Sequence, residues 1–187
     1  LATKLVSILF NFVMADFGLH ELLYPDRETV NFPIHGYGDR MQFFLSLSAG
    51  YFLWAMLVSI FYQGSPVAVL QNMTFGALCV MGLQPFMQSY LAVFLFMQAS
   101  TLILDMYACG RLLIRRESKY LFLSVIHPVM FFIARVVVAL PLSYTSLKFL
   151  IDAWPRHDAY LATSFLCLTL LVNIFNLYWF ISMASAS

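Results

Sequence analysis

The sequence predicts an all-α protein, a polytopic bundle of about six membrane-spanning helices, from its composition and from the length of its apolar segments. Of its 187 residues, 62% are hydrophobic and only 10% are charged, whereas a soluble domain usually carries about 25% charged residues. A helix needs roughly 20 apolar residues to cross the bilayer, and a membrane β-strand uses only about 9–11. The apolar runs of this chain have the length of helices, so we expect most of it to lie within a membrane.

Six apolar segments have the length of a span, and together they form one transmembrane domain over residues 1–187. They are residues 4–23, 41–62, 66–83, 85–108, 119–140 and 158–183. The first is expected to be a retained span, because Asp16 and Glu21 stand where a signal peptide needs small residues for cleavage. The polar composition of residues 24–40 predicts an aqueous loop. Gly64-Ser65-Pro66 predicts a tight turn before a helix N-terminus, and the short link at 83–85 makes its two helices antiparallel neighbours.

The charged residues favour one orientation in the membrane. The formal net charge of +1 gives no electrostatic reason to expect nucleic-acid binding. A basic cluster follows the fourth predicted span and contains Arg111, Arg115, Arg116 and Lys119. The positive-inside rule places this cluster, the turn near Gly64 and both chain ends on the cytoplasmic side or its organellar equivalent. An alternative role for the cluster is to bind anionic lipid headgroups.

Several polar residues lie inside the predicted spans. A rise of about 1.5 Å per residue places Gln71, Asn72 and Asp105 together, about 8–9 Å below the cytoplasmic surface, with Gln98 deeper at about 20 Å. We expect the first three to form a hydrogen-bonded cluster that packs helices together. The alternatives are a site for a lipid or its headgroup, and a catalytic site. His127 precedes a proline that should kink the fifth helix, and we expect its ring to hydrogen-bond locally.

Arg135 is the most deeply placed basic residue, about 24 Å from the cytoplasmic end of the fifth predicted span. An arginine inside a membrane almost always has a partner. The same arithmetic places Asp16 at about 18 Å and Glu21 at about 25 Å, whereas Asp105 is too shallow by about 15 Å. We therefore expect an ion pair between Arg135 and Asp16 or Glu21. The alternative is that Arg135 holds a ligand.

No residue pattern indicates a cofactor or a metal ion. The three cysteines, Cys79, Cys109 and Cys167, have neither the spacing of a zinc site nor that of a disulfide framework. No two of the four histidines lie within one helical turn of each other. We therefore expect neither a cofactor nor a metal site.

Four short strings occur in an order that is typical of one family. Residues 48–54 read S-A-G-Y-F-L-W, residues 98–101 read Q-A-S-T, residues 131–135 read F-F-I-A-R, and residues 176–180 read N-L-Y-W-F. They resemble the S-x-G-Y-F-L-W-D, E-x-S-T-P-F-L-N, F-F-x-x-R and N-x-Y-W-F strings of the TLC-domain family, named for the TRAM, Lag and CLN membrane proteins. The resemblance implies a TLC-type helix bundle. Within the family, the chain is most similar to the lipid-homeostasis branch rather than to the ceramide synthases.

The chain departs from the family pattern at the positions that ceramide synthases are thought to use in acyl transfer. The paired histidines of the family fall on Gln71 and Asn72, the aspartate of the first string is Ala55, and the glutamate of the second is Gln98. An imidazole is the natural general base near neutral pH, whereas an amide cannot exchange a proton there. The resemblance therefore implies a family site that has lost its catalytic pair.

These observations predict a non-catalytic integral membrane protein that binds or organises membrane lipids. One alternative is a structural accessory subunit embedded in a larger membrane complex, so the expected partners are membrane lipids and other membrane subunits. A second is an acyltransferase-like enzyme related to ceramide synthases, with Asp105 or His127 in place of the histidine pair. The resemblance points to the endoplasmic reticulum, with a mitochondrial or other organellar membrane as the alternative.

Overall fold

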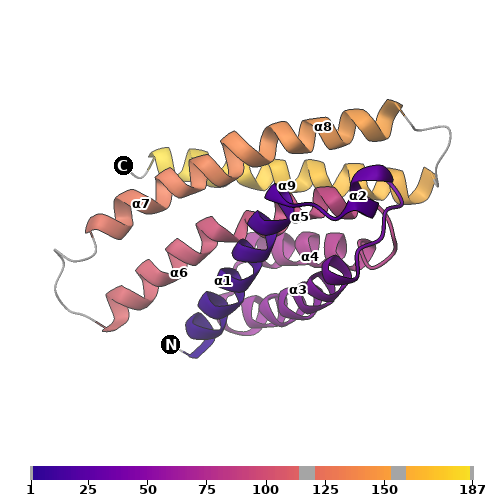
Figure 1. The fold of residues 1–187 in the computed structure, drawn as a ribbon. Helices are drawn as coiled ribbons and strands as arrows, with labels where there is room; N and C mark the ends of the chain where they lie inside the picture. The colour runs from indigo at the N-terminus through magenta and orange to yellow at the C-terminus, as the bar shows by residue number, and fades with distance from the viewer. Residues whose placement is uncertain (1, 114–120, 153–158, 186–187) are drawn as a thin grey trace.

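The computed structural model describes residues 2–113, 121–152 and 159–185, and within these ranges the chain is a bundle of helices without strands (Figure 1). In chain order the elements are α1 (Ala2–Leu23), α2 (Arg27–Asn31), α3 (Asp39–Val58), the π-helical turn η1 (Ser59–Gln63), α4 (Pro66–Met81), α5 (Gln88–Phe96), α6 (Gln98–Leu113), α7 (Leu121–Phe131), the π-helical segment η3 (Phe132–Val138), α8 (Ala139–Asp152) and α9 (Ala159–Ser185).

The apolar helices confirm the predicted all-α transmembrane class. Five helical segments in the described part of the chain are long and apolar enough to cross a membrane. They are Ala2–Leu23, Asp39–Tyr62, Gln88–Gly110, Val125–Asp152 and Ala159–Met183. The remaining predicted span, residues 66–83, corresponds to α4, a shorter apolar helix that ends at Met81. Each of the six predicted segments therefore overlaps with an apolar helical segment, which in some cases is made of more than one of the elements named above.

The fifth predicted span was expected to end at residue 140, but its helix continues through α8 to Asp152. Pro141 lies shortly after η3, where the regular ladder of backbone hydrogen bonds is already interrupted, so the missing N–H of the proline is tolerated. Further along α8, Ser143, Ser146 and Leu150 are buried against the rest of the bundle. Tertiary packing thus maintains the helix beyond the predicted end.

The predicted turn between the second and third spans is present. The backbone N–H of Gly64 donates to the carbonyl of Ser59 at 3.0 Å, and Gly64 has a φ of 62°, which glycine adopts without strain. The Ser65 side chain then caps α4 by accepting from the backbone N–H of Ala68, and Pro66 occupies the first turn. In the predicted aqueous loop, residues 27–31 form the short helix α2, which Asp26 caps.

Helices α1 and α5 approach each other closely at Gly18. A Cβ atom added at Gly18 would lie 2.9 Å from the carbonyl oxygen of Ala92 and 2.9 Å from the carbonyl carbon of Leu95. Both are backbone atoms, so only glycine permits this approach. Because α1 also packs on α6, it is held against the centre of the bundle along its length.

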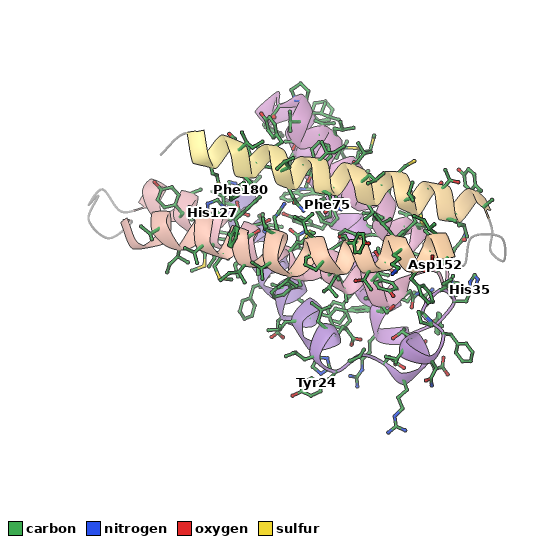
Figure 2. The ribbon with its side chains drawn as sticks, turned by 90° about the horizontal axis from the view of Figure 1, so that it is seen from above. Tyr24, His35, Phe75, His127, Asp152 and Phe180 are labelled. Carbon is green, nitrogen blue, oxygen red and sulfur yellow. The ribbon has the colours of Figure 1, made fainter. Side chains whose placement is uncertain are left out.

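The labelled side chains of Figure 2 mark the two ends of the bundle. His35 and Asp152 lie toward one end, whereas His127 and Phe180 lie toward the other (Figure 2). The chain ends labelled in Figure 1 lie at the latter end, as the predicted six-span topology requires.

Candidate functional site

A cavity of about 460 Å³, partly open to its surroundings, lies between the helices near the end that holds both chain termini. Its walls come from α1, α3, η1, α4, α6, α7, η3 and α9. The polar residues that line it are Thr3, Lys4, Ser7, Tyr51, Ser59, Gln71, Asn72, Ser100, Thr101, Asp105, His127, Arg135, Trp179 and Ser182. Apolar side chains, among them Trp54, Val58, Leu104 and Phe131, complete the walls. The cavity therefore combines an apolar lining with convergent polar groups.

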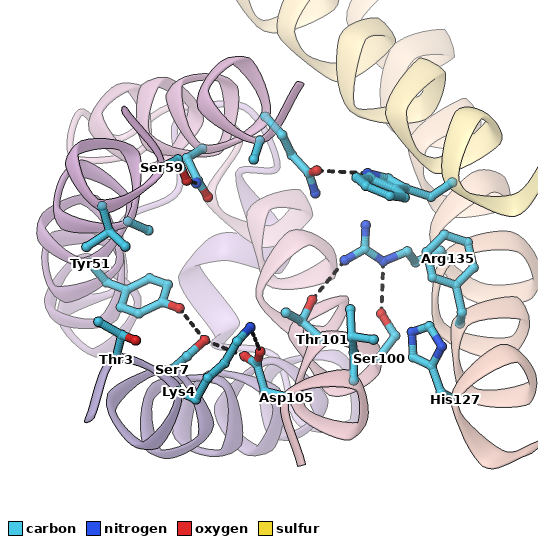
Figure 3. A pocket seen from close by; sticks show the side chains of 18 of the residues that line it. Thr3, Lys4, Ser7, Tyr51, Ser59, Ser100, Thr101, Asp105, His127 and Arg135 are labelled. Carbon is cyan, nitrogen blue, oxygen red and sulfur yellow. Dashed lines mark hydrogen bonds and ion pairs between the residues drawn. The ribbon is translucent and has the colours of Figure 1, made fainter. Parts of the chain in front are cut away.

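Asp105 lies on one side of this cavity, bound by residues of α1 (Figure 3). The Nζ atom of Lys4 is 2.6 Å from its Oδ1 atom, in an ion pair. Its Oδ2 atom accepts hydrogen bonds from Ser7 Oγ and, at 3.1 Å, from Asn11 Nδ2. Ser7 uses its one hydroxyl proton to donate to the carboxylate. In its contact with Tyr51, 2.7 Å away, Ser7 Oγ is therefore the acceptor and the hydroxyl of Tyr51 is the donor. Both oxygens of Asp105 are thus occupied by donors of the protein, and its charge is balanced by Lys4.

Arg135 lies across the cavity from Asp105, on η3 (Figure 3). Its Nε atom donates to Ser100 Oγ at 2.9 Å and its Nη2 atom to Thr101 Oγ1 at 3.0 Å. Its Nη1 atom donates to Asn176 Oδ1 at 2.9 Å, and its guanidinium carbon is 5.0 Å from the ring centre of Phe131. The side chain is buried, with 4% of the residue's surface exposed. All three hydrogen-bond acceptors are neutral.

The predicted ion pair of Arg135 with Asp16 or Glu21 is wrong. Among the described residues the salt bridges are Lys4–Asp105 and His20–Glu21, and Asp16 is exposed. A constant rise of about 1.5 Å per residue gives the depth of a side chain only if the helices are straight, parallel and start at one level. However, the fifth helix extends beyond its predicted end, and the π-helical segment that carries Arg135 departs from the regular rise per residue.

The residues at the lost histidine positions face the cavity, each with its own partner. Gln71 Oε1 accepts from Trp179 Nε1 at 2.9 Å, and Asn72 Nδ2 donates to Ser59 Oγ at 3.2 Å. With Asp105 they line one cavity, but the expected hydrogen-bonded cluster among the three does not form, since each bonds elsewhere.

The remaining predicted residues are divided between the cavities and the part of the chain that is not described. His127 lines the main cavity, near Phe131. Gln98 is buried and lines a smaller cavity of about 60 Å³, whose walls also include Gln71, Thr101 and Arg135. Of the basic cluster, Arg115, Arg116, Lys119 and the side chain of Arg111 lie outside the described residues.

The four strings that resemble the TLC family meet at this cavity. The first contributes Tyr51 and Trp54 to its wall, and the second contributes Ser100 and Thr101. The third contributes Phe131 and Arg135, and the fourth contributes Trp179 to the wall and Asn176 as a partner of Arg135. Segments far apart in the sequence are therefore joined by one buried guanidinium.

The comparison with known families agrees with this convergence. The family model described as the TLC domain, of the TRAM, LAG1 and CLN8 proteins, matches residues 1–185. The chain belongs to the TLC-domain family. No curated protein and no solved structure gives a significant match. The match of this TLC domain covers all six apolar helical segments and every residue that lines the cavity.

The sequence analysis missed the α1 side of the site. Lys4, Ser7 and Asn11 all bond to Asp105, and their spacing of three and four residues places them on one face of a helix. This pattern was available in the sequence as a polar stripe on an apolar segment.

Proposed function

We propose that this TLC-domain protein binds a membrane lipid in its internal cavity and does not catalyse acyl transfer. The observation that carries the proposal is the cavity itself, about 460 Å³ in volume, with apolar walls and a few converging polar groups. Small-molecule sites usually have volumes of about 300–1,000 Å³ and this kind of lining. In a bilayer, the molecules available to enter such a cavity are lipids.

The polar contacts support binding rather than catalysis. Gln71 and Asn72 carry amides, which cannot act as general bases near neutral pH, and each is already engaged by a neighbouring side chain. Both oxygens of Asp105 are also engaged, so a substrate would have to displace Lys4, Ser7 or Asn11 to reach the carboxylate. At positions 71, 72 and 105 the side chains are therefore amides or an occupied carboxylate, and His127 is the one imidazole among the described residues that line the cavity.

Membership of the TLC-domain family also supports a role related to membrane lipids. On the same resemblance we propose the endoplasmic reticulum as the membrane in which the protein acts. Localisation of a tagged protein against markers of the endoplasmic reticulum and mitochondria tests this placement, and we expect it to overlap with the first.

The lipids that copurify with the protein test the proposed function. We expect mass spectrometry of protein purified in detergent to find about one bound lipid per protein, which Ala55→Trp should displace because this side chain would occupy the cavity. The matched control is Val80→Trp, since Val80 is 58% exposed on the outer face of α4. Retention by the control and loss from the cavity variant would support the proposal. Equal retention by both, or no retained lipid, would refute it.

A further inference from the structure

The charges of the described residues that line the cavity do not balance. Among the described residues that line it, Lys4 and Arg135 are cationic and Asp105 is anionic. Lys4 and Asp105 neutralise each other at 2.6 Å, whereas the partners of Arg135 are two hydroxyl groups and one amide. One positive charge therefore remains, and it is carried by the more buried of the two cations.

Neutral acceptors satisfy hydrogen bonds but do not compensate a charge in a medium of low dielectric constant. A guanidinium has five N–H donors, and the three hydrogen bonds of Arg135 use one on each nitrogen. One N–H on Nη1 and one on Nη2 remain. Because a guanidinium binds carboxylates and phosphates through pairs of N–H groups, Arg135 can accept one more anionic partner.

The size of the cavity limits the ligand. A water molecule takes about 30 Å³ of liquid volume, and a methylene group is of similar size. The cavity of about 460 Å³ therefore holds on the order of 15 such groups. This is enough for most of a single acyl chain, and a second chain would have to lie outside the cavity. The apolar side chains of Trp54, Val58 and Leu104 are suitable walls for that chain.

The charge selects the headgroup. A phosphate monoester carries about −1.5 to −2 charges near neutral pH, which exceeds the one unbalanced positive charge. A carboxylate or a phosphodiester carries one negative charge and balances it, and the carboxylate is the smaller of the two groups and matches a pair of N–H donors. We propose that the ligand is a single-chain amphiphile with one carboxylate, a long-chain fatty acid, whose headgroup binds Arg135. This inference rests on the proposed function and names the ligand class of the same cavity.

The unmodified protein can test the headgroup by tryptophan fluorescence, because Trp54 and Trp179 both line the cavity. Dibromostearate, a quenching fatty acid, should quench saturably and be displaced by palmitate. The neutral methyl ester of palmitate should compete at least about tenfold more weakly, since it loses the charge-assisted hydrogen bonds. Lysophosphatidate with the same chain should also compete more weakly than palmitate.

Asn176→Asp provides a variant with nearly unchanged shape. Its new carboxylate would lie where Oδ1 of Asn176 now accepts from Arg135 at 2.9 Å, so it should neutralise the guanidinium from within. We expect palmitate to bind at least about tenfold more weakly to this variant, while the methyl ester binds as before. Asn31→Asp is the matched control, because it makes the same change at an exposed residue of α2.

The outcomes separate this inference from the proposed function. Equal binding of palmitate and its methyl ester to the unmodified protein would overturn the fatty-acid inference and leave a lipid site. Tighter binding of lysophosphatidate would overturn the carboxylate headgroup. Absence of saturable quenching by dibromostearate would overturn the fatty-acid inference, whereas absence of any copurified lipid would refute the lipid-binding function itself. Preference for palmitate that disappears in Asn176→Asp and persists in Asn31→Asp would support the inference.

Discussion

The amide oxygen of Asn176 accepts a hydrogen bond from Nη1 of Arg135 at 2.9 Å, across a sequence separation of 41 residues. This contact joins α9 to η3, while Ser100 and Thr101 join the same guanidinium to α6. Arg135 therefore holds three parts of the bundle together at the edge of the cavity. Its hydrogen-bond partners in the fold are neutral, and no carboxylate of the described residues pairs with its charge.

Asn176→Leu should destabilise the protein, because it leaves one N–H of a buried guanidinium without its acceptor. The expected loss is about 1–3 kcal/mol, measured by unfolding in detergent. A double-mutant cycle with Arg135→Met should show coupling between the two residues. Cycles of Arg135→Met with Asp16→Asn or Glu21→Gln serve as controls, and coupling confined to these acids would contradict the structure.

Lys4→Met should destabilise the protein by leaving the buried carboxylate of Asp105 without its cation. We expect a cost of about 1–2 kcal/mol, below the 3–5 kcal/mol typical of a fully buried pair, because 38% of the Lys4 side chain is exposed. Adding Asp105→Asn should restore part of the stability, since removal of both charges leaves none unpaired. Thermal unfolding of the two variants checks this, and simple additivity of the two losses would argue against the ion pair.

The two glycines Gly18 and Gly50 should respond in opposite directions to alanine. Gly18→Ala places a methyl group against the backbone of α5 and should cost about 1–3 kcal/mol. A methyl group at Gly50 meets nothing within 4 Å, so Gly50→Ala should stabilise the helix by up to about 1 kcal/mol. Melting temperatures of the two variants provide the comparison. A similar shift in both would mean that α1 and α5 are less closely packed than described.

Restoring the family histidines with Gln71→His and Asn72→His should not produce acyl transfer. Ala55 and Gln98 also differ from the family pattern. In addition, Trp179 Nε1 already donates a hydrogen bond to the side chain at position 71. Assays with acyl-CoA and long-chain amine acceptors should detect no product from the unmodified protein or from the double variant. Turnover by the unmodified protein would overturn the non-catalytic proposal.

The sequence predicted the fold class and the position of most helices, because apolar runs of span length have few alternative structures in a membrane. Of the candidate residues named from the sequence, those that line the cavity are Gln71, Asn72, Asp105, His127 and Arg135. Ser100, Thr101 and Asn176 lay within the four family strings, but their contact with Arg135 was not predicted. Contacts between distant helices depend on tilt, rotation and π-helical turns, which the spacing of residues in the sequence does not specify.

The partner of Arg135 illustrates this limit. The charge of Arg135 suggested an acidic partner, and its expected depth in the membrane suggested an acid of α1. In the structure, however, Glu21 pairs with His20 and Asp16 is exposed. The acid that does face the cavity, Asp105, is paired with Lys4. A buried cation whose hydrogen-bond partners are all neutral is unusual. The proposed anionic ligand would supply the counter-charge that the partners of Arg135 lack.

Photo-crosslinking tests the central claim, that a lipid occupies the cavity, most directly. A fatty acid with a photoreactive group in its chain would be added to membranes that contain the protein, and the modified residues would be identified by peptide mass spectrometry. We predict saturable labelling of the cavity walls, at Trp54 and Leu104, that excess palmitate suppresses. Labelling confined to the outer faces of the helices, such as Leu9 and Phe12, and unaffected by palmitate would contradict the claim.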